Sequence, residues 1–187
     1  MNYCSNCGAR VALRIPPGDD RARYVCAACH TIHYQNPRVV AGCIPQWQDQ
    51  VLLCRRAIEP RYGKWTLPAG FLENGETTAE AAARETLEEA NARVVIDAPF
   101  SLLDIPRINQ VYLMFRARLL DLDYGPGSES LEVQLFREAD IPWETLAFPA
   151  VEQTLVLYFE DRRLGRFCMH NRAIWHRPGE ARPVSPG

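Results

Sequence analysis

The sequence predicts an α/β domain preceded by a small zinc ribbon. Four cysteines near the N-terminus are spaced as in a tetrahedral zinc site, apolar segments typical of strands follow them, and two later segments carry helix signals. A chain of 187 residues that is 47% hydrophobic can bury one full core, so we expect one main domain and a small appendage. We place the ribbon at residues 1–37, the main domain at 38–165, and a partly disordered C-terminal extension at 166–187.

The N-terminal cysteines form two pairs, each with two residues between its members, and 18 residues separate the pairs. This spacing predicts a structural Zn²⁺ site whose ligands are Cys4, Cys7, Cys26 and Cys29. Cys29 and His30 also complete the spacing of a c-type haem attachment, but that chemistry usually requires export and leaves the first cysteine pair unexplained. We expect His30 and His33 at the surface or beside the zinc ligands.

Charge and hydropathy do not favour nucleic acid or a membrane as a partner. The net charge is −2, and the five arginines and two aspartates of residues 1–38 are largely offset by the charge of about −2 on a zinc–tetrathiolate centre. The ribbon tyrosines form no stacking series like that of single-strand binders, so we expect the ribbon to be structural or to build a dimer. No apolar run reaches the roughly 18 residues of a spanning helix, and the N-terminus lacks the apolar segment of a signal peptide, which predicts a cytoplasmic protein.

The main domain begins with two apolar runs around a polar turn, at residues 39–44 and 51–54, which predict two strands. We expect a short strand and a loop containing Gly and Asn in residues 65–76, and further strands in residues 109–120 and 131–136. Residues 148–165 predict an amphipathic helix that ends at its terminal glycine. The remaining assignments are a loop at residues 123–130 and a disordered tail at residues 176–187.

The helix predicted between Thr77 and Asn91 gathers glutamates at its C-terminal end. Thr77 and Glu80 form a capping-box pattern, and Asn91 suits a left-handed C-cap. At 100° per residue, one face carries Glu85, Glu88 and Glu89, and the opposite face, predicted to pack on the sheet, carries Ala79, Ala83, Thr86, Leu87 and Ala90. Mutual repulsion and the helix dipole cost this acidic face roughly 1 to 4 kcal/mol. A solvated acidic surface is the alternative, but a bound divalent cation, Mg²⁺ or Mn²⁺, explains why the acids gather at this end.

Gly70, Glu76 and the segment from Arg84 onwards resemble the Nudix box, whose pattern is G-x5-E-x7-R-E-aliphatic-x-E-E-x-G-aliphatic. Every charged position matches, whereas two aliphatic positions hold smaller residues and Asn91 stands at the glycine. With its cysteine ribbon and the segments "WTLPAGFLENGE", "ESLEVQLF" and "LAFPAVEQTL", the chain is similar to the zinc-ribbon Nudix hydrolases of bacteria and plant plastids, some of which cleave FAD or ADP-ribose. The resemblance implies an α/β/α sandwich with a mixed sheet, divalent-metal-dependent hydrolysis of a nucleoside diphosphate linked to another group, and a homodimer.

The resemblance also implies roles for individual residues. The ligands of Mg²⁺ or Mn²⁺ would be Glu85, Glu88, Glu89 and the Gly70 carbonyl, with Glu76 contacting the metal indirectly or from the phosphate side. Arg84 would orient one of the glutamates. Glu132 matches a glutamate outside the box that holds a metal or acts as the base, and Glu129 competes with it for this role. A water activated by the cation and a carboxylate would attack phosphorus in line.

Aromatic and basic residues are candidates for binding a nucleotide. A ring could stack on Trp65, Phe71, Tyr112 or Phe115, and phosphate could bind Arg55, Arg56 or Arg107, although strand aromatics also serve as core and arginines as surface. The signature S-Q-P-W-P-F-P of the family's NADH pyrophosphatases and cap-removing enzymes is absent after the box, so FAD and ADP-ribose are the expected substrates and NADH is the alternative. A third interpretation, a nucleotide sensor that regulates through its ribbon, is disfavoured by the intact acids.

Overall fold

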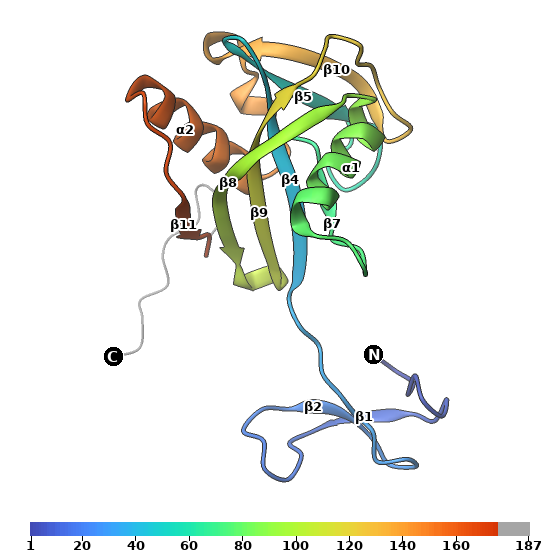
Figure 1. Ribbon diagram of the computed structural model, residues 1–187. Coiled ribbons are helices and arrows are strands. Elements are labelled where there is room, and N and C mark those ends of the chain that lie inside the picture. Colours follow the sequence, from blue (N-terminus) through green and yellow to red (C-terminus); the bar gives the residue numbers. More distant parts are fainter. Residues whose placement is uncertain (176–187) are drawn as a thin grey trace. The chain divides into compact units, whose positions relative to one another are not determined.

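The computed structural model of the protein describes residues 1–175, which divide into two compact units (Figure 1). The first unit is Met1–Pro37 and the second begins at Arg38. The tail that the sequence predicts to be disordered, residues 176–187, lies outside the described residues. No helix in residues 1–175 is both long enough and apolar enough to cross a membrane.

The first unit is a three-stranded antiparallel sheet with strand order β1-β2-β3. Its strands are β1 (Val11–Arg14), β2 (Arg23–Cys26) and β3 (Ile32–His33). The unit buries few side chains, among them Cys4 and Cys26. The cysteine turns therefore form the centre of this unit in place of an apolar core.

The second unit is built on an eight-stranded mixed sheet. Its strands are β4 (Arg38–Trp47), β5 (Gln50–Arg56), β6 (Trp65–Thr66), β7 (Ala69–Phe71), β8 (Val94–Ile105), β9 (Gln110–Leu119), β10 (Ser130–Arg137) and β11 (His170–Ala173). The order is β10-β5-β4-β9-β8-β11, with β6 on β5 and β7 on β4. The β4–β9 and β8–β11 pairs are parallel and the other pairs are antiparallel, which confirms the expected mixed sheet.

Two helices, α1 (Thr78–Ala90) and α2 (Pro149–Arg163), cover opposite faces of this sheet (Figure 1). Neighbouring residues of β4 show the alternation: Cys43 packs with Ala82 of α1, whereas Ile44 packs with Leu155 of α2. Because successive strand residues point to opposite faces, both faces are buried and the α/β/α sandwich is confirmed. Three short 3₁₀ turns complete the unit, at Pro106–Ile108, Glu138–Asp140 and Trp143–Thr145.

The ends of α1 are as the sequence predicts, whereas its packing face is only partly so. The Thr77 side chain accepts from the Glu80 amide in a capping box, and Asn91 takes the left-handed C-cap conformation with φ 48°. Leu87, predicted to pack on the sheet, is 49% exposed, whereas Ala82 and Glu89 are buried. Thr86 and Ala90 of the predicted face are buried as expected, so the buried face overlaps the predicted one but is rotated towards Ala81, Ala82 and Glu89. Small alanine side chains let the helix approach β4 closely in this orientation.

The predicted strands at residues 39–44, 51–54, 109–120 and 131–136 lie in β4, β5, β9 and β10, and the predicted closing helix is α2. The sequence did not predict β8 or β11. Pro99 interrupts the apolar pattern of β8, and β11 is short and polar. Since β11 pairs with β8, the segment after Gly165 contributes a strand to the sheet of the second unit.

Candidate active site

A cavity of about 650 Å³ lies at the end of the sheet where β7, β9 and the C-terminal half of α1 meet. The acidic residues that line it are Glu85, Glu88 and Glu89 of α1, Glu129 of the loop before β10, and Glu59 and Glu73. We call Glu85, Glu88, Glu89 and Glu129 the acidic wall. Its larger apolar and aromatic lining residues, which we call the apolar wall, are Ile58, Phe71, Ile108, Tyr112 and Phe148. The cavity therefore offers carboxylate oxygens and an apolar surface to one ligand.

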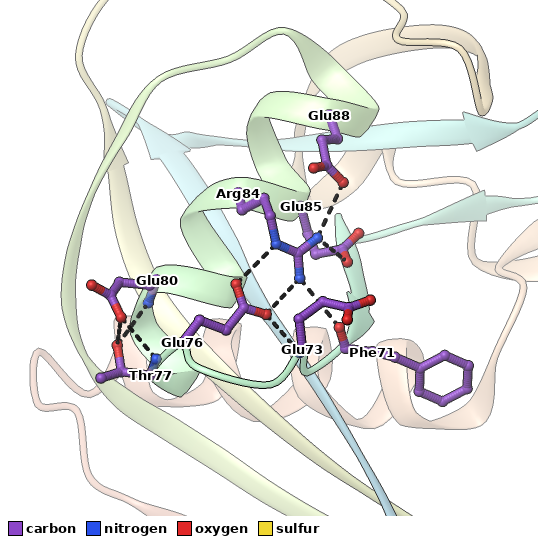
Figure 2. A network of polar contacts seen from close by, with 8 residues as sticks. All are labelled: Phe71, Glu73, Glu76, Thr77, Glu80, Arg84, Glu85 and Glu88. Atoms are coloured by element: carbon purple, nitrogen blue, oxygen red, sulfur yellow. Dashed lines mark hydrogen bonds and ion pairs between the residues drawn. The ribbon is translucent and has the colours of Figure 1, made fainter.

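Arg84 holds the glutamates of this region together, as Figure 2 shows. Its Nε and Nη2 donate to the Glu76 carboxylate at 2.9 and 2.7 Å, and its Nη1 donates to Glu85 at 2.7 Å and to Glu88 at 3.1 Å. Nη2 also donates to the Phe71 carbonyl at 3.2 Å. The hydrogen bonds from Arg84 lower the pKa of Glu76 to about 2. The repulsion expected from the sequence is thus partly offset inside the chain, by a residue that fixes two of the acids in place.

Glu89 lacks such a partner. Its side chain is buried, and among residues 1–175 its Oε2 atom has no hydrogen-bond donor. Burial raises the pKa of Glu89 to about 8, the charge of Glu85 acts in the same direction, and Arg56 opposes the shift. A buried carboxylate oxygen without a donor, next to other carboxylates, suits a hard divalent cation such as Mg²⁺ or Mn²⁺. The donor set therefore fits the metal that the family resemblance implies.

Gly70 lies in β7 directly beside the Glu85 carboxylate. A Cβ atom at this position would come within 2.2 Å of Glu85 Cδ, which real side chains do not tolerate. Only glycine allows the β7 backbone and the carboxylate to approach so closely. Gly70 and the glutamates of α1 thus lie next to one another in the cavity wall.

The loop at residues 125–129 is fastened to the C-terminal end of α1. The Gly125 amide donates to the Ala90 carbonyl at 2.8 Å, and the Gly127 amide donates to the Glu89 carbonyl at 3.0 Å. The Asn91 side-chain amide donates to the carbonyls of Gly125 and Pro126 at 3.3 and 3.0 Å. The two glycine amides satisfy helix carbonyls that would otherwise lack donors, and all four bonds hold the start of the loop that brings Glu129 to the cavity.

The two candidate bases are placed differently. Glu129 lines the cavity, whereas Glu132 lies on β10 with its Oε2 atom 3.5 Å from Arg55 Nη1. Among the described residues, neither Glu132 nor Arg55 lines the cavity. Glu76 does not line the cavity either, and its carboxylate forms an ion pair with Arg84.

Only some of the substrate-binding candidates line the cavity. Phe71, Tyr112 and Arg56 line the cavity. Trp65 instead packs edge-on against Phe136, with ring centroids 4.9 Å apart. Within residues 1–175, Arg107 and Phe115 are also absent from the cavity wall, and Phe115 is buried beneath α1.

Phe148 is a cavity residue that the sequence analysis missed. It is the residue before Pro149 at the N-terminus of α2, and the Arg56 guanidinium lies 5.2 Å from the centre of its ring. The Phe-Pro pair at a predicted helix start was the available signal. Gln110 and Ser128 were also missed, because nothing local distinguishes a cavity-lining amide or hydroxyl from a surface one.

The ribbon cysteines form a second potential metal centre. Cys4 Sγ lies 3.6 Å from Cys29 Sγ, and Cys7 Sγ lies 3.5 Å from Cys26 Sγ, with all four sulfur atoms within 4.8 Å of one another. The His33 Nε2 atom is 3.3 Å from Cys4 Sγ, beside the cluster as expected. Because both cysteine pairs meet at one point, the arrangement fits tetrahedral zinc rather than haem attachment.

Family models and one solved structure match nearly the whole described chain. The model of the NUDIX domain matches residues 36–153, and the zinc-ribbon model described as Nudix N-terminal matches residues 2–35. The crystal structure of a NUDIX hydrolase from Nitrosomonas europaea is 57% identical to the chain, with a TM-score of 0.92, and the match covers 94% of this chain and 100% of that one.

Two curated relatives differ in their substrates. The NAD-capped RNA hydrolase NudC of Photobacterium profundum is 31% identical over 167 residues, which are 84% of this chain and 59% of that protein. The ADP-ribose pyrophosphatase of Methanocaldococcus jannaschii is 29% identical over 116 residues, which are 58% of this chain and 67% of that protein. The chain thus spans about 59% of the length of the first of these relatives.

Proposed function

Because the chain belongs to the Nudix hydrolase family, we propose that it hydrolyses the pyrophosphate bond of a nucleoside diphosphate linked to another group, with Mg²⁺ or Mn²⁺ as cofactor. One observation carries this proposal: the buried, donor-free oxygen of Glu89 lies in the same cavity wall as Glu85 and Glu88. Such a wall binds cations, and the apolar wall of the same cavity accepts a ring.

The proposed roles follow from the contacts. Glu85, Glu88, Glu89 and the Gly70 carbonyl would hold the metal. When bound, Mg²⁺ or Mn²⁺ neutralises phosphate charge and lowers the pKa of water. Arg84 positions Glu85 and Glu88 through its Nη1 atom, and Glu76 in turn orients Arg84.

We assign the general base to Glu129 rather than Glu132. Glu129 lines the cavity beside the acids of α1, whereas the carboxylate of Glu132 pairs with Arg55. A general base must come within hydrogen-bond reach of the water that it deprotonates, directly or through one other water. Of the two glutamates, Glu129 meets this condition better.

FAD or ADP-ribose is the proposed substrate class, giving AMP and FMN or AMP and ribose 5-phosphate. Phe71, Tyr112 and Phe148 provide apolar surface for a ring, and Arg56 provides a cation for a phosphate in the same cavity. The segment after α1 places Ile108 and Gln110 in the cavity, and it lacks the S-Q-P-W-P-F-P signature. The similarity to an ADP-ribose pyrophosphatase supports this choice.

A reduced or RNA-linked nicotinamide nucleotide is the second candidate substrate. The 31% identity to an NAD-capped RNA hydrolase favours it. Both candidate substrates would bind the acidic wall through the metal, and they differ only in the group that would bind the apolar wall. A non-catalytic sensor is disfavoured, because the charged residues of the Nudix box are intact and a regulator would be free to lose them.

A panel assay tests the proposal. The full-length protein is incubated with Mg²⁺ and FAD, ADP-ribose, NADH or NAD-capped RNA, and the products are identified. We expect AMP to be released, with a higher kcat/KM for FAD or ADP-ribose than for NADH. A preference for NADH or capped RNA would select the second candidate, and no turnover of any of the four would contradict the enzymatic function.

Three further expectations belong to this proposal. The ribbon holds structural zinc, supported by its four close sulfur atoms. The protein is cytoplasmic, supported by free thiols in both units, since reducing compartments preserve them. It forms a homodimer, which sedimentation velocity would test.

A further inference from the structure

After α2 the chain returns to the sheet as β11 (Figure 1). Three potential metal ligands lie close together at this connection. Asp161 lies in the last turn of α2, Cys168 in the connection, and His170 at the start of β11. The His170 Nε2 atom is 2.9 Å from Asp161 Oδ2, and Cys168 Sγ is 3.7 Å from Asp161 Oδ2 and 3.6 Å from His170 Nε2. One ion could contact all three atoms.

A cation would stabilise the charge of Asp161 more than that of an ordinary surface carboxylate. It is buried, and it lies at the helix end where the dipole is negative. The neighbouring arginines have other partners: Arg162 donates to the Asp49 carbonyl, and Arg163 pairs with Glu138. Within residues 1–175, the one ion-pair partner of Asp161 is His170, and that pair is ionic only when the ring is protonated.

The distances between the three atoms resemble those around zinc. Zinc lies about 2.3 Å from sulfur and about 2.0 to 2.2 Å from nitrogen or oxygen, so its tetrahedral ligands are separated by about 3.3 to 3.7 Å. The two distances that involve Cys168 Sγ already match, and the Asp161–His170 contact would lengthen by about 0.5 Å.

The surroundings hold two of the ligands in place. The Phe100 ring packs edge-on against the His170 ring, with centroids 5.1 Å apart. The Cys168 amide donates to Asp161 Oδ2 at 3.0 Å, which keeps the connection against the helix end. Cys168 itself is exposed, so a fourth position would be open to solvent.

We propose that Asp161, Cys168 and His170 form a second zinc-class site, separate from the ribbon and from the acidic cavity. Sulfur, nitrogen and oxygen together suit Zn²⁺ or Co²⁺ and do not suit Mg²⁺, which prefers oxygen ligands. Binding releases the thiol proton of Cys168 and requires the neutral His170 ring in the tautomer that carries its proton on Nδ1, so that Nε2 is free to bind the ion. The bound ion fastens the edge strand β11 to the end of α2.

Cobalt binding to the full-length protein tests this site. The ribbon is first loaded with zinc, Mg²⁺ is added in excess to occupy the acidic cavity, and Co²⁺ is then titrated. We expect an absorption band for charge transfer from thiolate to cobalt, saturating at one equivalent of Co²⁺ per chain. Cys168 is the exposed thiol outside the ribbon among residues 1–175, so it should be the source of the band.

Two variants and a matched control separate this site from adventitious binding. Cys168→Ser should abolish the band, and Asp161→Asn should weaken Co²⁺ binding by about tenfold or more while the thiol is retained. Met169→Ser, in which another exposed sulfur side chain of the same connection is replaced, should retain the band. No band in the parent protein, or a band that persists in Cys168→Ser, would overturn the proposal. Circular dichroism confirms that each variant is folded.

Discussion

Glu85 and Glu88 share the guanidinium group of Arg84, whereas Glu89 is buried without a donor for one of its oxygens. Of the three carboxylates at the end of α1, Glu89 is therefore the one that Arg84 does not compensate. A bound divalent cation would compensate its charge, and without the cation the carboxylate retains its proton to an unusually high pH.

We expect Glu89→Gln to make the free energy of unfolding less dependent on pH in buffer without Mg²⁺ or Mn²⁺. Burial raises the pKa of Glu89 from 4.5 to about 8, so between these values the folded protein holds a proton that the unfolded chain has released. The associated stability is complete below the lower value and is lost towards the upper one, with a slope of up to about 1.4 kcal/mol per pH unit. Urea unfolding at several pH values measures the slope, which should be shallower in the variant.

Glu88→Gln is the matched control for this experiment. Glu88 lies one residue earlier on the same helix, its side chain is 57% exposed, and it pairs with Arg84. An exposed ion pair contributes about 0 to 1 kcal/mol, so this variant should keep the pH slope of the parent. Equal slopes for the parent and Glu89→Gln would show that Glu89 is not the group that retains a proton.

Gly70→Ala should reduce turnover with little loss of stability. The added Cβ would displace the Glu85 carboxylate, with which it would otherwise overlap at 2.2 Å. A displacement of about 1 Å at a catalytic group can reduce the rate on the order of 10²-fold. The control is Gly125→Ala, because a Cβ there meets no atom within 4 Å. Similar kcat values for the two variants would show that Gly70 is not part of the active site.

The connection between α1 and the loop after β9 shows how one element positions another. Asn91 ends α1 in the left-handed conformation, and its side chain also donates to two loop carbonyls. Glycine, the residue of the family pattern at this position, could provide the conformation but not the two hydrogen bonds.

We therefore expect Asn91→Gly to fold normally but to lower kcat by about one order of magnitude, because the loop that carries Glu129 loses two tethers. Thermal melting and steady-state kinetics measure the two effects. Asn91→Ala is the comparison: it loses the same tethers and also puts alanine at positive φ, so it should be less stable than Asn91→Gly. Unchanged kcat in both variants would show that the tethers do not position Glu129.

Local signals predicted the ends of α1 correctly, because a capping box and a left-handed cap depend on residues a few positions apart. The packing face was only partly right: Thr86 and Ala90 are buried as predicted, but Leu87 is exposed, because periodicity ranked it above alanine and could not include how closely the helix approaches β4. Strand β11 was missed for a related reason. Its four residues are polar or small and give no strand pattern, and its parallel pairing with β8 is a long-range contact.

The two units should differ in their dependence on zinc. The first unit has few buried side chains and centres on its cysteines, whereas the second has an extensive core on both faces of its sheet. We expect Cys26→Ser to unfold residues 1–37 while the second unit keeps its melting temperature, because a small unit without its metal buries too little apolar surface. Amide hydrogen exchange of each unit measures this difference. Protection of residues 1–37 in the variant would contradict a zinc-dependent ribbon.

At the scale of the whole molecule, the sequence predicted the acidic wall of the cavity better than its apolar wall. Glu85, Glu88 and Glu89 fall within one short motif, so spacing alone brings them together on α1. Phe148 and Glu129 reach the cavity from distant segments, and only the assembled sheet shows that they meet. The choice between Glu129 and Glu132 depends on where β10 begins, which the sequence leaves open.

The most direct test of the acidic wall combines Mg²⁺ binding and ADP-ribose turnover in Glu88→Gln, with Glu152→Gln as control. Both changes neutralise one exposed glutamate on a helix, but Glu152 lies on α2, away from the cavity wall. We predict that Glu88→Gln binds Mg²⁺ more weakly and loses turnover by on the order of 10² or more, at least about 2.7 kcal/mol of transition-state stabilisation. Glu152→Gln should match the parent protein. Full activity and unchanged Mg²⁺ affinity in Glu88→Gln would contradict a metal-dependent role for the glutamates of α1.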